Sequence, residues 1–298
     1  MVKAIVLSFF ITQIVFTLLD LAVLYRQKKT AGSFEWADYK ESLLFIFGIW
    51  LVYLVVQTAG AGILPGMTTF KEHFFQWLDI SGEGDSTWTW KVTVMLLWSF
   101  HVIGFFDFVT HRWILHTKHF WFFHEYHHLP KLVFNGMPGI SVRPYAFFAT
   151  LLTYAGSIFF IFWPLKHLLS AAEVRAFLDA GLPLLIFILA LVLATGHSLL
   201  LRQFRSVHSF LQILLLATPH EHVLHHSNQL RCNYGNFVTI WDRLFKSYVD
   251  PMKRDFHAEP LGLNYDQDHL GALCRGKFKL SEKHRRRFRL KDIVCLKD

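Results

Sequence analysis

Long apolar runs are the feature that most constrains the fold of this chain. Five runs occur, approximately from Ala4 to Leu24, from Leu43 to Leu64, from Val92 to Val109, from Phe147 to Leu165 and from Leu182 to Leu200. A helix of roughly 20 apolar residues is long enough to cross the hydrocarbon core of a bilayer. The composition agrees, because 53% of the 298 residues are hydrophobic and only 17% are charged. The sequence therefore predicts an all-α integral membrane helical bundle.

The distribution of basic residues predicts how the bundle is oriented. Lysine and arginine follow the first, third and fifth runs, whereas the segment from Gly66 to Trp90 is mainly acidic. Because cytoplasmic segments are enriched in Lys and Arg, we expect the N-terminus outside and the ends of these three runs inside. The protein would then be a multi-pass protein of a bacterial inner membrane or the endoplasmic reticulum. The first run is long for a signal-peptide core, so we expect a retained anchor.

Two further stretches have the pattern of helices that lie in the membrane interface. Apolar residues recur at near-helical spacing between Phe70 and Leu78, and again between Phe204 and Leu216. The formal net charge of +8 includes a basic tail around His284 to Lys291. On a membrane protein this tail indicates attraction to anionic headgroups, and no nucleic-acid-reading motif accompanies it. The three cysteines are too scattered for a thiolate metal site or a disulfide framework.

Histidines recur in three short motifs. These are HRWILH, with His111 and His116; HEYHH, with His124, His127 and His128; and HVLHH, with His222, His225 and His226. On a helix the positions i, i+3 and i+4 share one face, so each HxxHH motif can direct three imidazoles to one point. The first two motifs follow the third apolar run and the last follows the fifth, which places all three on the same predicted inner side. His197 lies at the inner end of the fifth run and is close enough to join them.

The number and spacing of these histidines predict more than one metal ion. His111 and His116 are five residues apart, about 140° around an α-helix, so we expect this pair to straddle a helix end. A structural zinc site takes four ligands and a catalytic zinc site usually three. Eight or nine imidazoles therefore suit two ions. Imidazole binds zinc, copper, nickel and iron, so the ligand type alone does not name the metal.

With these motifs in place, the sequence resembles the fatty acid hydroxylase and sterol desaturase superfamily of membrane di-iron enzymes. The likeness runs from about Asp107 to Tyr248. It includes the three histidine motifs in order, Arg143-Pro144, the NYG sequence at Asn233 and the WDRLF sequence at Trp241. Three positions depart from the family pattern: Lys246-Ser247 stands where Gly-Thr is frequent, and Phe108 where a tyrosine is common.

The resemblance implies that nine histidines ligate two iron ions. They are His111, His116, His124, His127, His128, His197, His222, His225 and His226. His220 is an extra histidine that either ligates or lines the site. Removing hydrogen from an unactivated alkyl carbon needs a redox-active metal and O2, which agrees with iron and excludes zinc. The implied reaction is hydroxylation or desaturation of a fatty acyl chain or sterol.

Four carboxylates are candidates for a supporting catalytic role. Ligating imidazoles usually donate their second N–H to a carboxylate or a carbonyl. The nearest acidic residues to the motifs are Asp107, Glu125, Glu221 and Asp242. Two other polar residues, Asp20 and His101, lie within apolar runs, where a functional role and simple interhelical hydrogen bonding are both open.

Two other functions fit part of the pattern. HEYHH also satisfies the HExxH pattern of zinc metalloproteases, but that interpretation leaves HRWILH and HVLHH unexplained. A histidine-rich metal transporter would need ligands along a path through the membrane, and only His101 is central in a run.

The sequence also indicates the source of electrons and the division of the chain into regions. The sequence has neither a Rossmann fingerprint nor a haem-binding pattern, so we expect electrons from a separate redox carrier such as cytochrome b5 or ferredoxin. We divide the chain into transmembrane and interfacial helices over residues 1–106, a hydroxylase-like catalytic region with a transmembrane hairpin over 107–250, and a basic cytosolic tail over 251–298.

Overall fold

The computed structural model is helical throughout most of the part that it describes. It describes residues 2–26, 73–80, 84–117, 120, 124–128, 146–227, 231–253, 265–266 and 279–280. The longer helices are α1 (Val2–Arg26), α4 (Trp90–Val109), α6 (Ala146–Leu168), α8 (Leu182–Thr195) and α9 (Arg205–Ile213). The shorter ones are α7 (Ala171–Ala176), α10 (Pro219–His225) and α11 (Ile240–Leu244), with π-helical or 3-10 turns at Thr110–Leu115, Glu125–His128, Phe177–Gly181, Leu201–Gln203 and Pro251–Lys253. Two-residue strands β1 (Tyr265–Asp266) and β2 (Lys279–Leu280) pair antiparallel, with Tyr265 opposite Leu280. The predicted all-α class is thus confirmed.

Two continuous helices are long and apolar enough to cross a membrane. They extend over Trp90–Leu115, with 26 residues, and Ala171–Thr195, with 25. At about 1.5 Å per residue, each exceeds the roughly 30 Å of a hydrocarbon core. The third apolar run is therefore a helix as predicted, lengthened by a π-helical turn.

The boundaries predicted for the fifth run were wrong at both ends. The helix begins at Ala171 rather than Leu182, because Ser170 and Glu173 form a capping box that starts it. It ends at Thr195 rather than Leu200, and a turn with His197 follows. The first and fourth runs lie within α1 and α6, while Leu43 to Leu64 lies outside the described residues. Residues 73–77 form a short helix within the first predicted interfacial stretch.

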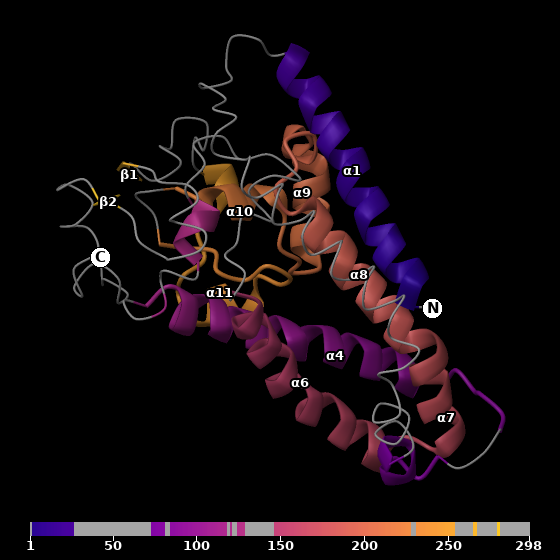
Figure 1. Ribbon diagram of the computed structural model, residues 1–298. Helices are drawn as coiled ribbons and strands as arrows, with labels where there is room; N and C mark the ends of the chain where they lie inside the picture. Colours follow the sequence, from indigo (N-terminus) through magenta and orange to yellow (C-terminus); the bar gives the residue numbers. More distant parts are fainter. Residues whose placement is uncertain are drawn as a thin grey trace, which may run out of the picture.

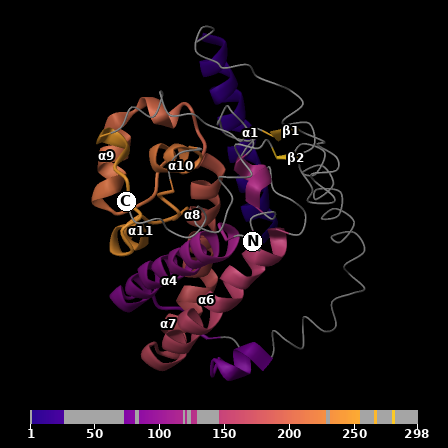
Figure 2. The same ribbon diagram turned by 90° about the vertical axis from the view of Figure 1, so that its left-hand side faces the viewer.

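The C-terminal ends of α4 and α8 lie at the same end of the helical bundle as the start of α6. The hydroxyl of Thr89 before α4 donates to Glu173 of α7 at 2.6 Å, so these two helices begin at the same end. The helix α6 runs the opposite way, because Thr153 near its start bonds Thr110 beyond the end of α4. The helix α1 lies along α8, as Figures 1 and 2 show. The helices α9, α10 and α11 gather beyond the C-terminal ends of α4 and α8 (Figure 1).

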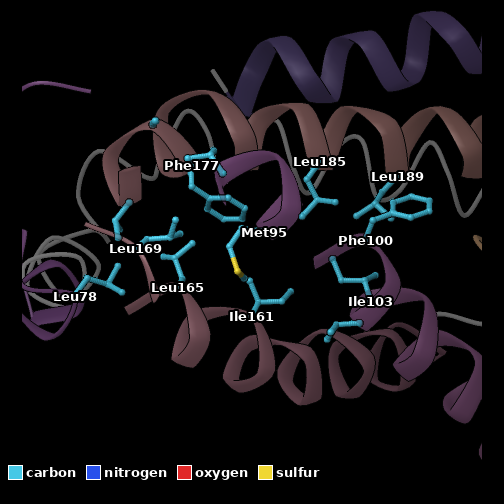
Figure 3. Packing of buried hydrophobic residues seen from close by; sticks show 14 of the residues in the cluster. Leu78, Met95, Phe100, Ile103, Ile161, Leu165, Leu169, Phe177, Leu185 and Leu189 are labelled. Carbon is cyan, nitrogen blue, oxygen red and sulfur yellow. The ribbon is translucent and has the colours of Figure 1, made fainter. Parts of the chain in front are cut away.

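The core lies between α4, α6 and the continuous helix of α7 and α8. Figure 3 shows Met95 and Phe100 of α4 between Ile161 of α6 and Leu185 and Leu189 of α8. The same helices also carry apolar residues outward. Exposed large side chains include Leu18 of α1, Leu97 of α4, Phe159 of α6 and Phe187 of α8. A helix that is apolar on all sides is typical of a lipid environment.

The helix α9 has two chemically different faces. Phe210 and Ile213 are 61% and 78% exposed, whereas His208 on the opposite face is buried. This agrees with the amphipathic pattern predicted between Phe204 and Leu216. The exposed apolar face suits a helix that lies in the plane of a membrane surface.

Candidate metal centre

The helix α10 carries three of the histidines and starts at a complete capping box. Thr218 accepts from the N–H of His220, and Glu221 accepts from the N–H and the hydroxyl of Thr218. Pro219 occupies the first helical turn, where its missing N–H costs nothing. Every residue of this helix is buried. A short helix with a fixed start therefore holds His222 and His225 in a defined orientation.

A π-helical turn brings the two histidines of the HRWILH motif to the same side. Residues Thr110–Leu115 form a π-helical turn, and the N–H of His116 donates to the carbonyl of His111 at 3.1 Å. A wider turn brings positions i and i+5 to the same side, which an α-helix does not. The pair straddles a helix end as predicted, because the helix widens after His111 and ends at Leu115, immediately before His116.

The structure brings all nine predicted histidines together in two groups. The first histidine group contains His111, His116, His124, His128 and His225, and the second contains His127, His197, His222 and His226. Within each group the candidate ligand nitrogens all lie within 4.8 Å of one another. The rings of His128 and His226, one from each group, are only 4.6 Å apart, so the groups are neighbours.

Each HxxHH motif contributes to both groups. His124 and His128 belong to the first group while His127 belongs to the second; His222 and His226 belong to the second while His225 belongs to the first. The prediction that each motif directs three imidazoles to one point was therefore wrong. The positions i and i+4 stay together, and position i+3 crosses to the other group. Each motif consequently ties the two groups to each other.

The nitrogen distances suit metal coordination. In the first group, Nε2 of His124 lies 2.8 Å from Nε2 of His111 and 3.1 Å from that of His128. In the second, Nε2 of His222 lies 2.9 Å from that of His197 and 3.2 Å from that of His226. Two imidazole nitrogens at right angles, each about 2.1 Å from one ion, would be about 3.0 Å apart. The residues therefore fit a metal ion in each group.

Backbone carbonyls orient two of the imidazoles. Nδ1 of His111 is hydrogen-bonded to the carbonyl of Tyr234, and Nδ1 of His225 to that of Cys232 at 2.9 Å. When Nδ1–H donates, Nε2 is left with a free lone pair that can bind a metal. Nε2 of His225 is buried and has no hydrogen-bond partner. Such an orphaned acceptor at the centre of a histidine group is the signature expected of a metal ligand.

Burial keeps these imidazoles neutral. It lowers the pKa of His225 to about 4, against the opposing effect of its bond to Cys232. The pKa values of His124 and His222 are lowered well below the usual range, first by burial and then by neighbouring histidines. Because only a neutral imidazole can ligate a metal, the protein holds these ligands ready at neutral pH.

The predicted carboxylates support the site one step further out than expected. Asp242 accepts from the N–H groups of Tyr234 and Gly235 at 2.9 and 2.7 Å, and from the hydroxyl of Ser247 at 2.7 Å. Asp107 accepts from the backbone and side-chain amides of Asn236, both at 3.0 Å. Both acids thus hold the loop whose carbonyl orients His111.

Glu221 and Glu125 complete the set of predicted acids. Glu221 caps α10 and accepts from the hydroxyl of Tyr248 at 3.2 Å. The expectation that Asp107, Glu221 and Asp242 accept directly from ligand imidazoles is corrected, since the observed acceptors for His111 and His225 are carbonyls. The side chain of Glu125 lies outside the described residues.

The remaining polar residues lie outside the two groups. Nε2 of His220 donates to the carbonyl of Arg202 at 2.9 Å, and His220 joins neither group. His101 makes an edge-on ring contact with Phe100 within α4 and also joins neither group. Asp20 is fully buried and hydrogen-bonds to the turn after α8, which is the interhelical role considered for it.

Sequence reasoning missed the loop that supports His111. The sequence did contain a signal for this loop, the NYG sequence, which supplies Tyr234 and Gly235. At Gly235 a Cβ atom would lie 2.3 Å from the carbonyl oxygen of Val238, so only glycine fits there. Lys246, where the family often has glycine, adopts a left-handed φ of 59°. Ser247 supplies the hydroxyl that a threonine would otherwise offer to Asp242.

The fold and site define a helical protein with two adjacent histidine groups that could each hold a metal ion. A family model described as fatty acid hydroxylase matches residues 92–247, just over half of the chain. The chain therefore belongs to the fatty acid hydroxylase family, as the resemblance predicted. Comparisons with curated proteins and with solved structures give no match.

Proposed function

We propose that this protein is a membrane-bound, O2-dependent di-iron oxygenase that hydroxylates or desaturates a lipid. The observation that carries the proposal is the pair of adjacent, buried, all-histidine groups in a chain of the fatty acid hydroxylase family. Two iron ions bound there would supply the oxidising power that activates O2 against an alkyl C–H bond. Hydroxylation consumes O2, two electrons and two protons and yields an alcohol and water. The electrons would come from a separate carrier such as cytochrome b5 or ferredoxin.

The residues of the chain prepare the site in three ways. The histidines stay neutral through burial and present Nε2 atoms at ligand spacing. The carbonyls of Tyr234 and Cys232 fix the orientation of His111 and His225. Asp242 fixes the Tyr234 loop in turn. Fixed ligands need no rearrangement when an ion binds, which favours affinity.

The surroundings favour a lipid substrate. The histidine groups lie at the C-terminal ends of two helices that are apolar enough to cross a membrane. The exposed apolar face of α9 lies at the same end. A substrate with an acyl chain or sterol ring system would partition into the adjoining hydrocarbon. We further propose several membrane passes with the site on the cytoplasmic face, in a bacterial inner membrane or the endoplasmic reticulum.

The two alternative functions account for less of the structure. A zinc protease would use His124 and His128, which do share a group, but three further imidazoles occupy that group. A transporter needs ligands along the membrane path, whereas the described histidine groups gather at one end of the helices.

Turnover of a lipid extract tests the proposal. The full chain, purified in nanodiscs and loaded with Fe²⁺, would receive ¹⁸O2, reduced ferredoxin and a mixed lipid extract. The proposal predicts lipid products that carry one ¹⁸O atom or that have lost two hydrogens, detected by mass spectrometry. His225→Ala should abolish product formation, whereas His167→Ala, at an exposed site at the other end of the bundle, should not. Oxygen-independent turnover, or none with any lipid class, would contradict the proposal.

A further inference from the structure

A buried carboxylate from α1 holds the turn that carries His197. Asp20 is fully buried. It accepts from the hydroxyl of Ser198 at 3.0 Å and from the N–H groups of Leu199 and Leu200 at 2.7 and 2.8 Å. The helix α8 ends at Thr195, so these donors belong to the turn that immediately follows it. One buried acid thus accepts three hydrogen bonds from a single turn.

This turn contributes to only one of the two histidine groups. His197 precedes Ser198 directly, and its Nε2 lies 2.9 Å from that of His222 and 3.2 Å from that of His226. The first histidine group takes none of its members from this turn. A shift of the turn would therefore move a ligand of the second group and no ligand of the first.

We propose that Asp20 is a positioning residue that fixes His197 and so sets the metal affinity of the second histidine group. Asp20 lies outside the residues 92–247 that match the family model, so α1 is a working part of the metal centre rather than only a membrane anchor. Bonds to a charged acceptor are about twice as strong as neutral ones, and they are strengthened further in a site without water. The inference rests on the proposed function only in that each group holds an ion.

Two backgrounds isolate the effect on each group. His225→Ala weakens the first group and leaves the second to be measured; His197→Ala does the reverse. Metal-stripped full-length protein in detergent is titrated with Co²⁺, and binding is followed by visible absorption. In the His225→Ala background, Asp20→Asn should weaken the remaining Co²⁺ by about 10- to 100-fold. In the His197→Ala background it should leave the remaining Co²⁺ affinity unchanged.

The control and the second variant make the result decisive. Asp79→Asn makes the same chemical change at an exposed site at the other end of the bundle, and it should alter neither affinity. If Asp20→Asn prevents folding, Ser198→Ala removes one of the three donors and should show a smaller effect with the same selectivity. An equal loss in both backgrounds would mean that Asp20 only stabilises the bundle, and would overturn the inference. A parent protein that binds no Co²⁺ would overturn both this inference and the proposed function.

Discussion

Replacing Asp242 with asparagine should destabilise the loop that orients His111. The carboxylate accepts three buried hydrogen bonds, two of them from the N–H groups of Tyr234 and Gly235. An amide would turn its NH2 toward at least one of these donors. Leaving a buried donor unsatisfied costs about 1–3 kcal/mol, and the loss of a charged acceptor weakens the remaining bonds. Burial raises the pKa of Asp242, which means that the buried charge itself is unfavourable, so its removal offsets part of the lost hydrogen-bond energy. We expect a net loss of about 3 kcal/mol in the free energy of unfolding.

Thermal unfolding in detergent, followed by tryptophan fluorescence, measures this loss. For a chain of 298 residues about 3 kcal/mol corresponds to a fall of about 5 °C in Tm. The matched control is Asp250→Asn, because Asp250 accepts from the N–H of Met252 at 2.9 Å but is partly exposed. It should lower Tm by about 2 °C or less. If the two variants unfold at the same temperature, the role assigned to Asp242 is refuted.

Three further predictions concern the histidine groups and their loop. His127→Ala should remove the ion of the second group and His225→Ala that of the first, although each residue belongs to a motif whose other two histidines are in the other group. Metal analysis should give one ion per chain for each variant, whereas loss of both ions would contradict the division into two groups. In the metal-free protein, the lowered pKa of His225 means that the free energy of unfolding falls as pH drops from 6.5 toward 4, by about 2 kcal/mol at pH 5. The reason is that His225 is protonated in the unfolded chain at these pH values but stays neutral in the folded chain. Burial raises the pKa of Glu221 to about 7, so protonation of this one group increases the free energy of unfolding as pH falls from 7 to 4.5. We expect the effect of His225 to exceed it, and a Tm that rises steadily between pH 7 and pH 5 would contradict this expectation. Gly235→Ala should cost metal affinity in the first group, since its Cβ would collide with the Val238 carbonyl; unchanged affinity in a Co²⁺ titration would be the contrary result.

The composition of the metal centre could be predicted from the sequence because its evidence is local. HEYHH and HVLHH place several imidazoles within five residues, and that density is visible without any structure. The order of apolar runs and basic segments predicted that both motifs end up on one side of a membrane. The structure places them at one end of the helices, with His197 among them.

The division of the histidines into two groups could not be predicted from spacing. Helical periodicity puts His222, His225 and His226 near one face, but the choice of group depends on which neighbouring segment meets each ring. His225 turns toward the carbonyl of Cys232, and that contact forms only when the segment 231–253 packs against α10. The π-helical turn before His116 likewise departs from the regular α-helix that spacing arguments assume.

Sequence analysis singled out Asp107 and Asp20, but not the donors that they bind. Asp107 donates no ligand atom to either group and instead binds Asn236, which lies 129 residues away in sequence. Asp20 binds a turn 178 to 180 residues away. Sequence identifies a costly buried charge, whereas only the packed fold shows which donors offset that cost.

The position of bound iron shows whether the two histidine groups each hold an ion. Crystals of the iron-loaded protein, measured on both sides of the iron absorption edge, would locate each ion by anomalous scattering. We expect two separate peaks, one surrounded by His111, His124 and His225 and the other by His197, His222 and His226. A single peak, or peaks away from these imidazoles, would contradict this expectation.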